Sequence, residues 1–217
     1  MLLKINTEKV KLFQQLFDEV GTELNNKDWE LRISLLREEL QELKEAFDNK
    51  DYVEIADAYG DLLFLTIGGM YKHGVPLEEI VLDFDENREL NVQMNDNVHE
   101  WLDAMIGFLE ESFALTLSYN VKCYKAVVLS ILNSIKFHSI PNFDKIFEEI
   151  CDSNLSKSDD SEHDALLTKQ KYDLQGIATY YGEKFGKFIT YRKSDNKVLK
   201  SYKYTAVDLA KHFKTEQ

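Results

Sequence analysis

Two clusters of acidic side chains on neighbouring predicted helices could together hold a divalent cation. The first is Glu38, Glu39 and Glu42, on a helix expected over residues 27–47; the second is Glu54, Asp57 and Asp61, on a helix expected over residues 51–72. At about 100° per residue, the acids of the second cluster fall within about 60° of one another and form a stripe. In the first cluster, Glu39 and Glu42 are three residues apart and lie on adjacent ridges. Oxygen ligands of this kind suit Mg²⁺ or a similar hard cation.

The acidic stripe on 51–72 conflicts with the rest of that helix, because apolar residues surround it and predict a central, buried position. The linker 48–50 is short, so the two helices should be antiparallel neighbours with their acids facing each other. Like charges that lose water together are unfavourable unless a cation joins them. A solvated acidic face is the alternative, and it applies most readily to Glu38 taken singly, because helix surfaces carry many glutamates.

The overall charge argues against several kinds of partner. The chain has 39 acidic and 26 basic residues, a formal net charge of −13, so it repels nucleic-acid backbones. We therefore expect no nucleic-acid partner. No apolar run approaches the roughly 20 residues of a membrane helix, and the N-terminus does not resemble a signal peptide. We expect no membrane partner and a cytoplasmic location, with Cys123 and Cys151 as reduced thiols.

The helical part of the chain contains a short sequence repeat, which we call the histidine echo. His73-Gly-Val-Pro76 is repeated as His138-Ser-Ile-Pro141, and long helices are expected before the second copy at 98–118 and 120–137. The first copy has a further helix from about Thr7 and another after Pro76. The pattern predicts an all-α antiparallel bundle duplicated as a pseudo-dimer, with a catalytic repeat at 1–92 and a degenerate second repeat at 93–157.

The C-terminal region, 158–217, has a different character. The polar stretch 153–170 predicts a loop or a short helix. Short β-prone runs follow at 177–181, 187–191 and 198–200, with turns expected at Gly182, Gly186 and 195–196. The prediction is a small antiparallel β meander that must pack on helices, because so few strands do not stand alone.

The acidic clusters resemble a family signature. Glu38-Glu39-Leu-Gln-Glu42 followed by Glu54-Ile-Ala-Asp57 is similar to the EExxE…ExxD pattern of the all-α, MazG-like NTP pyrophosphohydrolases. The run 53–63 resembles the third helix of the phosphoribosyl-ATP pyrophosphohydrolase-like branch. The segment 146–157 resembles the SNxSK stretch of that branch, and 196–204 resembles its C-terminal GKVLKGPNY stretch.

The resemblance implies a hydrolase that splits a nucleoside triphosphate between its α and β phosphates, releasing a monophosphate and pyrophosphate. It implies a Mg²⁺ cofactor, for which Mn²⁺ can substitute. The implied roles are metal ligation by Glu39, Glu42, Glu54 and Asp57; orientation or deprotonation of water by Glu39 or Glu38; and substrate binding by Asp61, Asn154, Lys157, Lys200 and Tyr204.

Departures from the family pattern leave alternatives open. SNxSK follows the second copy here rather than the third helix, and Tyr119 and Lys122 stand where the second copy would need Glu54 and Asp57. We therefore expect one functional metal site per chain, in a protein that is either a monomeric pseudo-dimer or a homodimer. Ser201-Tyr-Lys203 replaces Gly-Pro-Asn, which leaves the substrate open. The rival functions are a non-catalytic helical module that binds a nucleotide or a protein, and a phosphoribosyl-ATP pyrophosphohydrolase.

Overall fold

The structure, a computed structural model, combines helices with one small antiparallel sheet, as the sequence predicts. It describes residues 5, 7–17, 26–75, 77, 98–112 and 117–213. The chain divides into two compact units. The helical unit comprises 1–7, 21–148 and 208–217, and the mixed unit comprises 8–20 and 149–207. Among the described residues, no helix is long and apolar enough to cross a membrane.

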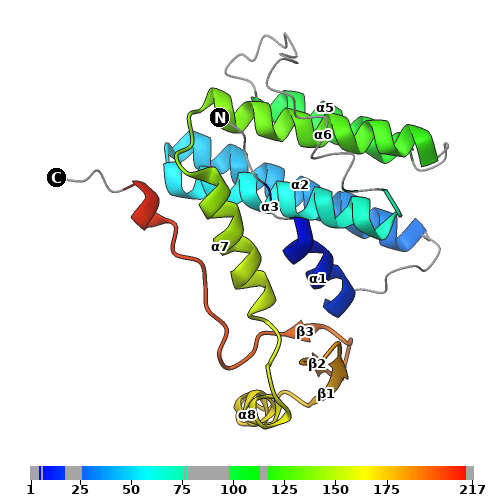
Figure 1. Cartoon of the computed structure of the whole chain (residues 1–217), viewed down its shortest axis with the longest axis vertical. Helices are drawn as coiled ribbons and strands as arrows, with labels where there is room; N and C mark the ends of the chain where they lie inside the picture. Colours follow the sequence, from blue (N-terminus) through cyan, green and yellow to red (C-terminus); the bar gives the residue numbers. More distant parts are fainter. Residues whose placement is uncertain are drawn as a thin grey trace. The chain divides into compact units, whose positions relative to one another are not determined.

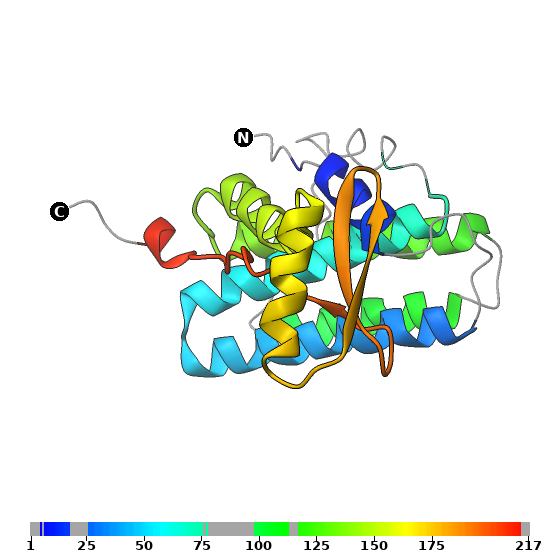
Figure 2. The ribbon, with the colours of Figure 1, turned by 90° about the horizontal axis from the view of Figure 1, so that it is seen from below.

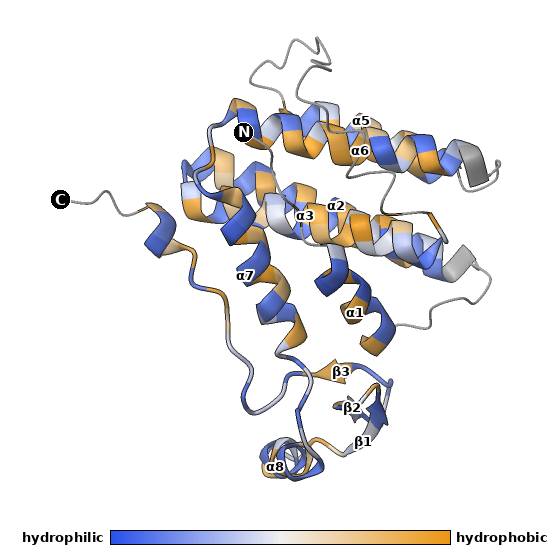
Figure 3. Ribbon diagram, viewed as in Figure 1, coloured by the Kyte–Doolittle hydropathy of each residue, from blue (hydrophilic) through white to orange (hydrophobic). Residues whose placement is uncertain are grey.

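The helical unit is built on two pairs of packed helices (Figure 1). Within each pair the helices lie against each other; between the pairs, α3 packs on α6 and α2 packs on α5. A short 3-10 helix near the C-terminus, η2, contacts α3. Hydrophobic residues recur along these helices and form the core between them (Figure 3). The elements are α2 (Asn26–Asn49), α3 (Tyr52–Lys72), α5 (Val98–Glu111), α6 (Leu117–Phe137) and η2 (Ala210–Phe213).

Helix α3 is the central helix that its composition predicts. The Asp51 side chain caps it by accepting hydrogen bonds from the backbone N–H groups of Val53 and Glu54, at 3.1 and 3.2 Å, an arrangement that stabilises a helix by about 1 kcal/mol. Lys72 ends it, and Gly74 follows with a positive φ of 69° that glycine adopts at little cost. Most of its residues are buried, and the acids lie on its less buried side.

Two reciprocal hydrogen bonds join the halves of this bundle. The Tyr59 hydroxyl on α3 bonds to Nδ1 of His138, just after α6, at 3.0 Å. The Tyr124 hydroxyl on α6 bonds to Nδ1 of His73, just after α3, at 2.8 Å. His138 follows Tyr124 by the same number of residues as His73 follows Tyr59. Such exchanged contacts are what two copies related by a twofold axis would make.

The echo extends to the backbone around the two histidines. Gly74 and Ser139, the next residues, both have positive φ, at 69° and 54°. Val75 and Ile140 are both buried. The limits of the two repeats, 1–92 and 93–157, stay predictions, and the helix predicted after Pro76 lies outside the described residues.

The mixed unit holds the sheet and three helical segments. Helix α7 begins in the helical unit and ends here. The sheet has the antiparallel order β1-β2-β3, and α8 packs on β1 and β2 (Figure 2). The elements are α1 (Thr7–Phe17), α7 (Phe143–Leu155), α8 (Glu162–Asp173), β1 (Thr179–Lys184), β2 (Lys187–Arg192) and β3 (Val198–Leu199).

Of the predicted turns, one is misplaced. Phe185 and Gly186 both have positive φ and form the two-residue hairpin loop, and Asn196 lies in the next turn with a φ of 58°. Gly182 instead lies within β1, paired with Ile189, so the turn predicted there is wrong. The physical reason is that one two-residue loop already reverses the chain, and a glycine is tolerated inside a strand. Part of the polar stretch predicted to be a loop or a short helix forms α8, which extends beyond that stretch to Asp173.

Removing the hydroxyl of Tyr59 should destabilise the bundle. We expect Tyr59→Phe to lower the free energy of unfolding by about 1 kcal/mol, because a part-buried hydrogen bond between the halves is lost. In a thermal melt this corresponds to a decrease of about 2–4 °C. The matched control is Tyr52→Phe on the same helix, where the ring is 63% exposed. Equal melting temperatures for the two variants would contradict the account.

Candidate functional site

The two acidic clusters lie on α2 and α3, two helices that pack against each other. Glu39, Asp57 and Asp61 are half-buried, whereas Glu38, Glu42 and Glu54 are exposed. The half-buried acids therefore sit in the low-dielectric part of the interface and the others border it. In this way the capped helix α3 and the hydrophobic stripe of α2 bring carboxylates from both helices within reach of one another's charge.

Burial and mutual repulsion perturb two of these acids strongly. Burial, followed by the neighbouring charges of Asp61, Glu42, Asp57 and Glu38 in that order, raises the pKa of Glu39 to about 8. Burial also raises the pKa of Asp57 to about 6, with contributions from Glu54 and Glu42. Perturbation by both burial and like charges is typical of functional carboxylates. At neutral pH and without a cation, Glu39 is largely protonated.

The donor chemistry of this cluster fits a hard divalent cation. Carboxylate oxygens are the preferred ligands of Mg²⁺, and a cation would relieve the repulsion that raises these pKa values. In the described part of the chain, however, no three Asp, Glu, His or Cys side chains already converge on one point. Side-chain rotation would be needed to complete a ligand set. Two of the four predicted ligands, Glu42 and Glu54, are exposed and have room to rotate.

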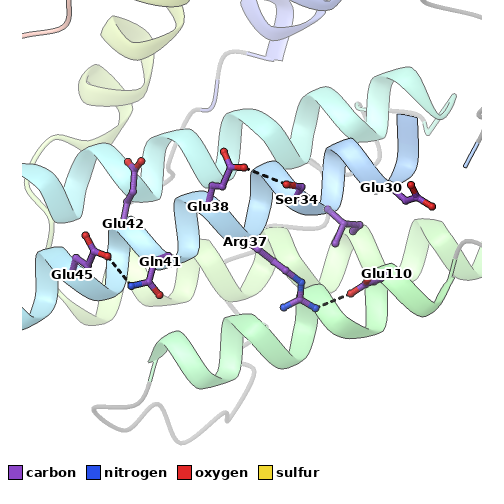
Figure 4. A pocket seen from close by; sticks show the side chains of 9 residues that line it. Glu30, Ser34, Arg37, Glu38, Gln41, Glu42, Glu45 and Glu110 are labelled. Atoms are coloured by element: carbon purple, nitrogen blue, oxygen red, sulfur yellow. Dashed lines mark hydrogen bonds and ion pairs between the residues drawn. The ribbon is translucent and has the colours of Figure 1, made fainter. Parts of the chain in front are cut away.

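A groove beside this cluster is lined by residues of α2 and by Glu110 of α5 (Figure 4). Its one cationic lining residue, among those described, is Arg37, which donates to Glu110 of α5 at 2.7 Å and to Asp103. Figure 4 shows Arg37 pointing toward Glu110, away from Glu38 and Glu42, which border the groove. At about 100° per residue, Arg37 and Glu39 are on opposite sides of α2. The groove therefore shares Glu38 and Glu42 with the acidic cluster but extends toward α5, and sequence reasoning missed it, because nothing in the sequence showed that α5 packs there.

The predicted substrate-binding residues of the mixed unit gather around the end of α7. The Lys157 ammonium donates to Oδ1 of Asn154 at 2.6 Å and lies 5.6 Å from the centre of the Phe13 ring. The Lys200 ammonium lies 4.2 Å from the centre of the Tyr204 ring. The Tyr204 hydroxyl in turn accepts a hydrogen bond from Ser153 Oγ at 3.4 Å. Two segments far apart in the sequence therefore meet within this unit.

Several other cations of this unit are ion-paired. Lys203 pairs with Asp164 at 2.7 Å, and Arg192 and Lys187 pair with Asp195 and Asp160. The unit has as many basic as acidic residues, so the formal net charge of −13 lies on the helical unit. A polyphosphate would meet repulsion from the helical unit unless a cation accompanied it.

Comparison with known proteins also leads to a class with a helical bundle and carboxylates on adjacent helices. Residues 10–88 match the family described as phosphoribosyl-ATP pyrophosphohydrolase. That family is part of the MazG-like superfamily of NTP pyrophosphohydrolases, so this segment of the chain is similar to that superfamily. The family indicates pyrophosphohydrolase activity in general, without naming the substrate.

The similarity to one relative extends through both units. An uncharacterised protein of Acanthamoeba polyphaga mimivirus is 22% identical over 214 residues, which covers 86% of this chain and 82% of the relative. No solved structure matches the chain.

The raised pKa values predict how stability depends on pH in metal-free protein. The pKa of Glu39 rises from 4.5 to about 8 on folding, so the folded state binds this proton more tightly than the unfolded chain. Stability should therefore fall as pH rises from about 4.5 to about 8. We expect Glu39→Gln to flatten this decline and to raise the melting temperature near pH 8 in EDTA.

Glu45→Gln is the matched control, because Glu45 is an exposed glutamate on the groove side of α2. Thermal melts from pH 5 to pH 8.5 would check both variants. A wild-type profile that stays flat, or one that Glu45→Gln changes as much as Glu39→Gln does, would refute the assigned cause.

Proposed function

We propose that this protein is a Mg²⁺-dependent nucleoside triphosphate pyrophosphohydrolase. The observation that carries the proposal is that Glu39 on α2 and Asp57 on α3 are half-buried and have raised pKa values, each in part because of an acid on the other helix, inside the segment that matches the family. A purely structural interface would gain stability if these acids were replaced by apolar residues. A cation that binds a phosphate substrate would offset the repulsion between these carboxylates and would account for their presence at the interface.

Glu39, Glu42, Glu54 and Asp57 would hold the cation, with Mn²⁺ as a substitute for Mg²⁺. The bound cation would offset negative charge on the phosphates and make a water molecule easier to deprotonate. Glu39 or Glu38 would orient the attacking water and accept its proton. The water oxygen bonds to phosphorus, the anhydride bond between the α and β phosphates breaks, and the products are a nucleoside monophosphate and pyrophosphate.

The remaining predicted residues would bind the substrate. Lys157 and Lys200 would act as point charges toward the phosphates, and Asn154 would hold the Lys157 ammonium in place. Tyr204 would support Lys200 through its ring. Asp61, which adds to the field at Glu39, would contribute to substrate binding from α3.

A second candidate substrate is phosphoribosyl-ATP, which the description of the matched family favours. It shares the α–β anhydride that the carboxylates would cleave. A non-catalytic helical module is the remaining alternative, and it requires no cation at α2 and α3. One assay separates the three functions.

The chemistry is tested by incubating the protein with each common NTP and dNTP, and with phosphoribosyl-ATP, in the presence of Mg²⁺. We expect pyrophosphate release from at least one nucleoside triphosphate, and loss of this release in EDTA. Asp57→Asn should lower kcat by at least about a hundredfold, because a ligand of the cation is lost, while the fold survives as judged by circular dichroism. Glu45→Gln should leave the rate unchanged. Release in EDTA, or full activity of Asp57→Asn, would rule out the assigned site.

The lysines are tested by Lys157→Met and Lys200→Met, which keep the length of the side chain and remove its charge. Each should raise KM about tenfold with a smaller change in kcat, because a charge that binds the ground state and the transition state alike is lost. Lys197→Met, an exposed position nearby in sequence, is the control. If KM for the lysine variants equals that of the control, Lys157 and Lys200 do not bind the substrate.

A further inference from the structure

Asp159, two residues after Lys157, is a buried acid that the proposed chemistry does not use. Its side chain is 1% exposed, and burial raises its pKa. Its Oδ1 atom accepts a hydrogen bond from the hydroxyl of Thr168, at 3.0 Å, and another from the hydroxyl of Ser201. Its backbone N–H and C=O both pair with Phe188 of β2, at 2.8 and 2.9 Å. Asp159 therefore joins the chain after α7 to α8, to β2 and to the segment after β3.

The bond to Ser201 fixes the two lysine-bearing segments to each other. The backbone N–H of Ser201 donates to the carbonyl of Lys157 at 3.1 Å, and Lys200 is the residue before Ser201. The Ser201 hydroxyl also accepts from the N–H of Lys203 at 2.9 Å, and the Ser201 carbonyl accepts from the N–H of Tyr204 at 3.1 Å. One serine, held by one buried carboxylate, thus sets the paths of both segments.

Thr168 of α8 also holds the segment after β3 in place. Its hydroxyl donates to Asp159 and accepts from the backbone N–H of Tyr202 at 2.9 Å. A second acid, Asp164, accepts from the Tyr202 hydroxyl at 2.8 Å and pairs with Lys203, and these bonds hold its pKa down to about 2. Lys203 is therefore neutralised in place. Lys200 is left with its ammonium over the Tyr204 ring.

This arrangement costs stability, so packing alone does not account for it. Among the described residues, Oδ2 of Asp159 has no hydrogen-bond partner although it is buried, and the same holds for the hydroxyls of Thr179 and Thr190. By the strand register these two threonines share a face of the sheet with Phe188, the partner of Asp159. A buried polar group without a full set of partners is unfavourable. An apolar residue would fill the same space at lower cost, but it could not hold Ser201 and Thr168.

We propose that Asp159 is a positioning residue that ties the end of α7 to the segment after β3, so that Lys157 and Lys200 meet the same polyphosphate. The proposal rests on the proposed function for the role of the two lysines, and it adds the element that fixes their separation. Preorganised charges bind more tightly because less conformational entropy is lost on binding. Asp159 itself is too buried to touch the substrate.

The test compares Asp159→Leu, which keeps the number of side-chain heavy atoms and removes both acceptors, with Asp159→Asn, which keeps an oxygen that can accept both hydroxyls. We expect Asp159→Leu to raise KM for the best nucleotide about tenfold with kcat within about twofold of wild type, and to weaken binding of tripolyphosphate in EDTA by a similar factor. Asp159→Asn should restore both values. Amide hydrogen exchange at Ser201 should be faster in Asp159→Leu and should return toward the wild-type rate in Asp159→Asn.

The matched control is Asp160→Leu at the next residue, whose side chain is 70% exposed; it should change none of these values. If Asp159→Leu does not fold, Thr168→Val removes one of the two hydroxyl donors at constant shape and should raise KM and the Kd for tripolyphosphate by about threefold.

The outcomes separate this proposal from the proposed function. Pyrophosphate release with an unchanged KM in folded Asp159→Leu or Thr168→Val would overturn the positioning role and leave the function intact. Tripolyphosphate binding that depends on Asp159, in a protein that releases no pyrophosphate, would support positioning and refute the chemistry. A lower melting temperature with unchanged KM and Kd would show a structural role alone and overturn the proposal. Wild-type protein that neither binds tripolyphosphate nor hydrolyses a nucleotide would overturn both.

Discussion

The repulsion between carboxylates at the interface of α2 and α3 is the constraint on which the functional account depends. Packing demands that this side of α3 be covered, and covering it removes water from Glu39 and Asp57, whose pKa values rise as a result. Only two outcomes are physically available: the acids take up protons, or a cation takes the place of the protons. The first costs stability at neutral pH, and the second converts the same interface into a binding site for phosphates. The net charge of −13 on the helical unit further favours the second outcome when a polyanionic substrate approaches these acids.

The parts of the fold that local chemistry decides could be predicted from the sequence. Helix α3 follows from an aspartate cap, a long apolar stretch and a glycine after its end, and its acids follow from helical periodicity. The hairpin β1-β2 follows from two β-prone runs around Gly186. The turn predicted at Gly182 was wrong because a glycine between β-prone residues is compatible with a turn and with the interior of a strand.

Contacts between distant segments could not be predicted, because each depends on how helices pack. Neither the pairing of Tyr59 with His138 nor that of Arg37 with Glu110 has a local signal. The histidine echo marked the positions but not their partners. Asp159 lies in a polar stretch that predicts a loop or a short helix and gives no sign of burial. It is buried because Ser201 and Thr168 donate to it from segments that only the folded chain brings close. The clearest functional inference from sequence was therefore the acidic clusters, and the clearest from structure was the link between the lysine segments.

The most direct test of the central claim is a Mn²⁺ titration followed by electron paramagnetic resonance on nucleotide-free protein. The account predicts saturable binding to the wild type, binding weakened by about tenfold or more in Asp57→Asn and in Glu54→Gln, and wild-type affinity in Glu45→Gln. Wild-type protein that leaves Mn²⁺ free at millimolar concentration, or that binds it equally well after each of these substitutions, would contradict the claim that the carboxylates of α2 and α3 form a cation site.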